Sequence, residues 1–290
     1  MDSYPLPLKG SICLFSLSGY KLGLLYNFST SGGVMGLCYV QNILIAAVNE
    51  KVELYILKSY NNDTVVELKF LDIYSNDGKV LTTCMDNYSK TIVIGDIMTF
   101  LTAYTLTGSS LESIALHHYS LSISSIKVLD EENFIAATDK EILVYQIDKA
   151  HTNIEPKDKY KIGKRINKFL YTSLKPLKTI LKCEEDKEES EVDDVRTVVY
   201  VTTQGSIGVI AIVPESLFKY ISAINDAIIR YEGNTYEFSH GKCFVNGNLA
   251  ESLLRMDKVK AERIYNEIYY AAKPSFKKTL NLLAKLSLTH

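Results

Sequence analysis

The chain has 290 residues, of which 47% are hydrophobic and 23% charged, and its formal net charge is −2 at pH 7. These values are typical of a globular protein with one large or two modest domains, and they exclude a global charge that would attract nucleic acid or an anionic membrane. The five cysteines are scattered without a C-x-x-C pair, which favours a reducing, intracellular compartment over a disulfide framework. No signal peptide or membrane span is expected, because the sequence shows no such apolar segment.

Pairs of short apolar strands separated by a tight turn recur along the chain. The first residues of these pairs are Asn42, Thr91, Asn133 and Thr197. A repeat of roughly 40 to 50 residues built from short strands is typical of a β-propeller. The sequence therefore predicts a mainly β fold, with a partial WD40-like β-propeller of about four blades.

The predicted strands form sets in chain order, seventeen strands in total. Two candidates come first, at 10–17 and 22–28, followed by three sets of four strands and one set of three. The sets are expected at 34–40, 42–48, 51–57 and 65–73; at 80–85, 91–95, 100–106 and 111–118; at 123–129, 133–137, 141–147 and 160–166; and at 168–173, 197–203 and 206–213.

Two glycine segments are expected to be turns. Gly95-Asp96 interrupts an apolar run and predicts the turn between two strands. Ser31-Gly32-Gly33 predicts a loop. It resembles a phosphate-binding loop only superficially, because the strand-loop-helix setting and the Lys-Ser/Thr pair are missing.

From Pro214 the apolar spacing changes to that of helices. One helix is expected to end at Gly233, one or two more over 249–271 with Asn248 as a cap, and a last one after Ser275. The inward positions of the last helix are expected to be Phe276, Leu280, Leu283 and Ala284. The predicted domains are 1–213, the propeller blades, and 214–290, a helical domain.

Two charged segments lie between the third and fourth strand pairs. Residues 157–178 are basic, and 184–194 are mostly acidic. The simpler interpretation is a solvated surface. The alternative is a nucleic-acid-binding patch made by Lys161, Lys164, Arg165 and Lys168, although the aromatic residues Tyr160, Phe169 and Tyr171 are expected in the core rather than stacked on bases.

The sequence lacks the common catalytic patterns. The histidines, including His117-His118, have no second ligand at metal spacing, and there is no G-x-S-x-G motif. Asp96 and Asp130 recur at blade turns, where an Asp side chain usually bonds backbone amides. The prediction is that the protein is not an enzyme and uses no metal or cofactor.

Four segments nevertheless resemble a known family when they are taken in order. They are residues 94–98, 124–134, 203–208 and 246–252. Together they resemble the C-terminal region of a family of large propeller scaffolds. Its members are the damaged-DNA-binding protein large subunit, the cleavage and polyadenylation specificity factor A subunit, and the propeller subunit of the branch-site splicing complex. The resemblance extends from about Lys9 to His290 and looks closest to the damaged-DNA-binding branch. A departure is Asn246-Gly247-Asn248-Leu249, where the family has Asp-Gly-Asp-Leu.

What the resemblance implies is a non-catalytic interaction scaffold. In the damaged-DNA-binding branch, one propeller docks a cullin, and the cleft between two others docks substrate receptors of a ubiquitin ligase. The implied role is the recruitment of such receptors in ubiquitination and DNA repair, in the nucleus and secondarily in the cytoplasm. Asn167 matches a polar position on the family's receptor-facing surface. The alternative is a subunit of a pre-mRNA splicing or cleavage and polyadenylation complex that contacts nucleic acid.

The number of strands leaves two architectures open. A seven-bladed propeller needs about 28 strands, more than the sequence predicts, and an incomplete ring exposes apolar faces and strand edges. In one hypothesis the chain is a fragment, and its partner is the rest of a split propeller. In the other it closes as a smaller ring, with Leu22–Phe28 as the outer strand of the last set.

Overall fold

The computed structural model describes residues 8–60, 65–75, 81–97, 100–118, 123–150, 152–171, 196–233, 243–271 and 273–287. Within these residues lie seventeen strands and four helices, so the predicted mainly β fold with C-terminal helices is confirmed. The chain folds as two compact units, which comprise residues 1–157 with 161–168, and residues 158–160 with 169–290. The division into domains after residue 213 stays a prediction.

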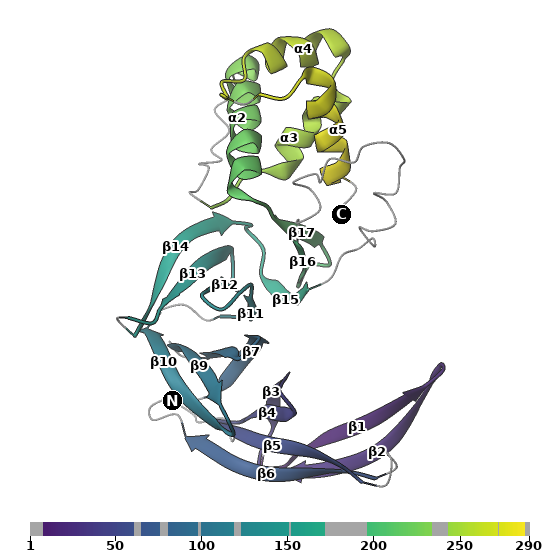
Figure 1. Ribbon diagram of the computed structural model, residues 1–290, viewed down its shortest axis with the longest axis vertical. Helices are drawn as coiled ribbons and strands as arrows, with labels where there is room; N and C mark the ends of the chain where they lie inside the picture. Colours follow the sequence, from purple (N-terminus) through teal and green to yellow (C-terminus); the bar gives the residue numbers. More distant parts are fainter. Residues whose placement is uncertain are drawn as a thin grey trace. The chain divides into compact units, whose positions relative to one another are not determined.

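Three four-stranded antiparallel meanders, here called blades 1 to 3, form the body of the first unit (Figure 1). Blade 1 comprises β3 (Val34–Val40), β4 (Ile43–Val48), β5 (Lys51–Tyr60) and β6 (Val65–Ser75). Blade 2 comprises β7 (Thr82–Tyr88), β8 (Thr91–Asp96), β9 (Phe100–Thr107) and β10 (Ser110–His118). Blade 3 comprises β11 (Ser125–Val128), β12 (Asn133–Ala137), β13 (Glu141–Asp148) and β14 (Asn153–Lys161).

The first strands of the blades lie next to one another. β7 is beside both β3 and β11, and β10 meets β14 in a parallel pairing at Leu116 and Asn153. This order, with one strand of each meander facing its neighbours, is that of adjacent propeller blades. The structure is therefore propeller-like, as the repeat spacing predicts.

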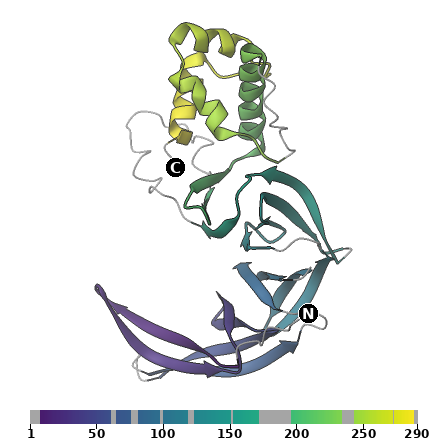
Figure 2. The ribbon, with the colours of Figure 1, turned by 180° about the vertical axis from the view of Figure 1, so that it is seen from behind.

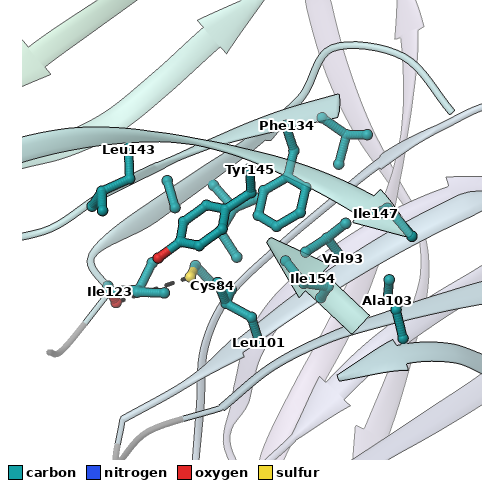
Figure 3. Close-up of a cluster of buried hydrophobic side chains, with 14 residues drawn as sticks. Cys84, Val93, Leu101, Ala103, Ile123, Phe134, Leu143, Tyr145, Ile147 and Ile154 are labelled. Carbon is teal, nitrogen blue, oxygen red and sulfur yellow. Dashed lines mark hydrogen bonds between the residues drawn. The ribbon is translucent and has the colours of Figure 1, made fainter. Parts of the chain in front are cut away.

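The blades are held together by apolar side chains between facing sheets. Every residue of β8 is buried, because both faces of this strand are covered. Between blades 2 and 3 the rings of Phe134 and Tyr145 stack at 5.1 Å between centroids, surrounded by Cys84, Val93 and aliphatic residues of both blades (Figure 3). Such close packing makes the inter-blade contacts sensitive to single methyl groups.

Two expectations about blades 2 and 3 were wrong. Gly95-Asp96 is not the turn, because both residues belong to β8, and Gly95 pairs with Cys84 and Leu101. A Cβ atom at Gly95 would lie 2.9 Å from Cys84 Sγ and 3.1 Å from Ile126 Cδ1, so the close approach of the neighbouring side chains explains this glycine. The outer strand of blade 3 is β14 at 153–161, several residues before the predicted 160–166.

Before blade 1 the chain forms the hairpin of β1 (Gly10–Ser18) and β2 (Lys21–Thr30), a two-stranded sheet (Figure 2). A separate sheet contains β15 (Ile166–Tyr171), β16 (Arg196–Thr202) and β17 (Ile207–Ile212). Leu22–Phe28 therefore belongs to the β1–β2 sheet, and the hypothesis that it is the outer strand of the last set is wrong for the described residues. Ser31-Gly32-Gly33 joins β2 to β3 as a turn, in which Gly33 N donates to Asn49 Oδ1 at 3.0 Å.

Four helices surround one apolar core in the second unit (Figure 1). They are α2 (Glu215–Glu232), α3 (Gly247–Arg255), α4 (Lys258–Asn266) and α5 (Phe276–Ser287). Gly233 ends α2 with a left-handed φ of 63°, as predicted, and Ser275 Oγ accepts from Lys278 N at the start of α5. The cap of α3 is Asn246, not Asn248, and Ala284 is exposed rather than inward.

Candidate functional site

The residues predicted to bind partners lie around the connection from β14 to β15. Ile162 N and Gly163 N both donate to Lys140 O at 2.9 Å, which ties this connection to the turn between β12 and β13. Ser124 Oγ donates to Ile166 O at 2.7 Å. These hydrogen bonds hold the backbone of the connection against blade 3, and its charged side chains extend from this anchored backbone.

The predicted basic residues differ in their surroundings. Lys161, Arg165 and Lys168 are exposed, whereas Lys164 is half-buried. Arg165 Nε lies 3.6 Å from Asp139 Oδ1, with both side chains more than half exposed. This pair is screened by solvent and contributes little to stability, so Arg165 stays available to other anions.

Asn167 and Lys168 are both exposed on β15, but they are consecutive residues of a strand. Successive side chains of a strand point to opposite faces. One flat surface therefore does not present both residues, so the predicted receptor-facing residue Asn167 and the basic residue Lys168 lie on different sides of β15.

The Cys84 thiol of β7 is buried in the core between blades 2 and 3. Burial raises the pKa of the Cys84 thiol to about 11, whereas the hydrogen bond from Thr83 Oγ1 and, to a lesser extent, the positive charge of Lys168 lower it.

The neighbouring aromatic residues only partly match the prediction. Phe169 is buried, as expected, and Tyr160 is half-buried with its ring 5.4 Å from that of Phe244. The side chain of Tyr171 lies outside the described residues, as do Lys175, Lys178 and the acidic segment 184–194. The structure thus shows no base-stacking surface among the described aromatics of this region.

Sequence reasoning missed an ionic contact between blades 2 and 3. Asp86 of β7 accepts hydrogen bonds from Lys127 Nζ at 2.9 Å and from Val128 N at 2.7 Å. The sequence did contain a signal for this contact, because Asp86 is the single charged residue of β7. Asp130 does take the predicted role in a turn, since its Oδ1 accepts from Glu132 N and Asn133 N.

The structure was also searched for metal ligands and membrane spans. Among the described residues, no group of three or more His, Cys, Asp or Glu side chains is placed to hold a metal ion. None of the helices in the described part of the chain is long and apolar enough to cross a membrane.

The fold and this surface together define a propeller-like β protein with a C-terminal helical region. Comparison with protein families shows that the CPSF A subunit region matches residues 2–243. The chain therefore belongs to the CPSF A subunit region family, as the ordered motifs predicted.

Two relatives illustrate the similarity. DNA damage-binding protein 1 of Oryza sativa subsp. japonica is 23% identical over 282 residues, which cover 89% of this chain and 25% of the relative. DNA damage-binding protein 1a of Arabidopsis thaliana is 25% identical over 281 residues, with the same coverage of both chains. The chain thus spans about a quarter of the length of the relatives that it matches.

Proposed function

We propose that this chain is a non-catalytic protein-interaction scaffold that recruits substrate receptors for ubiquitination and DNA repair in the nucleus. The observation that carries the proposal is the family match over residues 2–243, supported by relatives named DNA damage-binding protein 1. A blade framework suits this role, because rigid strands support connections that can vary without disturbing the fold.

Affinity purification with the chain as bait, followed by identification of the bound proteins, tests the proposal. Recovery of substrate receptors and other ubiquitin-ligase components is the expected result. Recovery of splicing or cleavage factors without any ligase component would contradict it.

We propose Asn167 as a contact residue for such a receptor. It is exposed on β15, and an Asn side chain can both donate and accept hydrogen bonds. Asn167→Arg is expected to weaken receptor capture at least tenfold, on the order of 1.4 kcal/mol, whereas the control Glu112→Arg on exposed β10 leaves it unchanged. Equal receptor capture by the Asn167→Arg and Glu112→Arg variants would show that Asn167 is not a contact residue.

A second candidate function is that of a subunit of an RNA-processing complex with nucleic-acid contact. The observation that favours it is the exposure of Lys161, Arg165 and Lys168 near one edge of blade 3. Binding of labelled single-stranded RNA should then weaken linearly with the logarithm of salt concentration, because phosphate contacts release counterions. Lys161→Gln/Arg165→Gln should reduce that slope, and absence of binding at low salt would exclude this function.

A further inference from the structure

The β1–β2 hairpin has two halves, one near blade 1 and one beyond it. The apolar side chains of the two halves lie on opposite faces of the hairpin. Near its base, Ile12, Leu14, Tyr26 and Phe28 pack against Ala46, Val48 and Tyr55 of blade 1. A register shift follows Leu14, which pairs with Tyr26, whereas Phe15 pairs with Leu24. Leu25 is therefore the extra residue of a β-bulge, which changes the faces on which the following side chains of β2 lie.

Beyond the bulge, the apolar side chains point away from blade 1. Phe15 pairs with Leu24 and Leu17 pairs with Leu22, so all four side chains share one face of the hairpin. They are exposed by 56%, 58%, 72% and 71%, respectively. We call these four residues the arm face. It is opposite the face that carries Ile12 and Leu14, because positions of odd and even number alternate along β1.

A second apolar surface lies open on blade 1 itself. Met35, Leu37 and Tyr39 of β3 are exposed by 43%, 49% and 52%, while Cys38 and Val40 of the same strand are buried against blade 2. We call these three residues the β3 row. The arm face cannot cover the β3 row of its own chain, since it lies on the side of the hairpin that is turned away from blade 1.

We propose that two copies of this chain exchange their hairpins, so that the arm face of each copy packs on the β3 row of the other. In such a two-fold arrangement residue i of one copy meets residue j of its partner, and the reverse contact forms as well. The exchange covers both open surfaces of both copies with one kind of contact. Each arm carries a single charge, Lys21, so like charges do not oppose the contact.

The exposed area agrees with a stable dimer. If a fully exposed large side chain presents roughly 200 Å², the arm face and the β3 row together offer at most about 800 Å² per chain. That is about the area that each partner buries in a standard specific interface. The arm face also ends at the bulge, and the same side of the hairpin carries the exposed Cys13 and Asn27 nearer its base. A short apolar surface of this size suits the β3 row better than the broad apolar face of a further four-stranded blade.

Light scattering across a concentration series tests the proposal on the 290-residue chain. The mass should approach twice 32.6 kDa, with a dissociation constant in the micromolar range, ~1–10 µM. Leu17→Lys on the arm face and Leu37→Lys on the β3 row should each raise that constant more than tenfold. Ser18→Lys is the matched control, because it places the same charge on the adjacent exposed residue of the opposite face and should leave the constant unchanged.

Mixing the two variants distinguishes hairpin exchange from other dimers. The Leu37→Lys chain keeps its arm face and the Leu17→Lys chain keeps its β3 row, so the mixture should associate more tightly than either variant alone. A wild-type monomer at about 100 µM overturns the proposal and leaves both surfaces to another protein. It is also overturned by a dimer that either variant leaves intact, or by a mixture that does not associate. A single cooperative thermal unfolding transition of each variant confirms that it is folded.

Discussion

Asp86 and Lys127 join the first strands of blades 2 and 3, with Lys127 Nζ 2.9 Å from both carboxylate oxygens of Asp86. The same carboxylate accepts from Val128 N at 2.7 Å. Their side chains are only 21% and 15% exposed, for Asp86 and Lys127 respectively. The carboxylate of Asp86 in blade 2 therefore accepts hydrogen bonds from both a charged side chain and a backbone amide of blade 3.

Removal of this carboxylate should destabilise the contact between the blades. Asp86→Ala removes the carboxylate acceptor of the poorly solvated Lys127 ammonium group and of Val128 N, and is expected to lower the free energy of unfolding by about 3 kcal/mol. Urea unfolding measures the change. Glu132→Gln is the control, because Glu132 and Lys149 form an exposed pair at 4.0 Å and the expected change is within about 0.5 kcal/mol. Similar losses in both variants would contradict the role given to Asp86.

The glycine of β8 should be required for close blade packing. Gly95→Ala places a methyl group 2.9 Å from Cys84 Sγ, and overpacking of this kind costs about 1–3 kcal/mol. In a Cys84→Ala background the clash with sulfur is gone, so the cost of Gly95→Ala should fall below about 1 kcal/mol. A double-mutant cycle by urea unfolding tests this coupling. Additive effects would show that the contact with Cys84 is not the reason that Gly95 is required.

The two buried thiols should make the first unit sensitive to alkaline pH. Burial is the main cause that raises the pKa of Cys38 from 9.0 to about 12 and that of Cys84 from 9.0 to about 11. Because each folded pKa lies above the unfolded one, the unfolded chain loses these protons first as the pH rises. The stability that the protonated thiols contribute is complete below about pH 9 and decreases as the pH rises toward 11.

Thermal unfolding from pH 8 to pH 10.5 checks this prediction. The wild-type chain should lose more stability over this range than Cys38→Ala/Cys84→Ala, and the difference between the two profiles is the quantity of interest. Tyr55 also has a raised pKa, caused by burial and by the neighbouring Glu53, but it is present in both proteins and its contribution cancels. Parallel profiles would contradict the prediction.

In the helical unit, removing the hydroxyl of Tyr220 and removing that of Thr279 should cost different amounts of stability. Tyr220 Oη and Thr279 Oγ1 of α2 and α5 share a buried hydrogen bond of 2.6 Å, and Thr279 Oγ1 also donates to Ser275 O at 3.1 Å. Tyr220→Phe leaves the threonine hydroxyl with Ser275 and should cost about 1 kcal/mol. Thr279→Val leaves the tyrosine hydroxyl without this partner and should cost about 2–3 kcal/mol. Denaturant unfolding that shows equal losses would contradict this asymmetry.

The pattern of strands could be predicted because it is a local property. Ile43–Val48 is apolar throughout, and Thr91–Asp96 has the apolar centre Ile92–Ile94; both runs are bounded by turn residues. A strand that is covered on both faces needs such a run. The amphipathic spacing of Leu217, Ile224 and Ile228 in α2 is local in the same sense. β14 was placed too late because its charged, proline-containing residues 153–159 have little strand propensity, and its pairing with the rest of blade 3 overrides that preference.

The candidate site was harder to predict, because it depends on contacts between distant residues. The positive charge of residues 161–168 is evident from composition, but the contact of Arg165 with Asp139 and the support from Lys140 O arise only when β14 returns beside β13. Likewise, Gly95 looks like a turn residue until Cys84 and Ile126 come within 3.1 Å of its missing side chain.

The sequence by itself determined the class of fold, the repeat of about 40–50 residues and the family, because periodic apolar runs and ordered motifs are properties of neighbouring residues. Only the tertiary structure decided which surfaces are left open. The arm face follows from one extra residue, Leu25, which sets Leu22 and Leu24 beside Phe15 and Leu17 on the side away from blade 1. Side chains along a strand alternate between two faces. A shift of one residue therefore moves apolar side chains from a buried face to an exposed one. Only the pairing of the two strands reveals where that shift occurs.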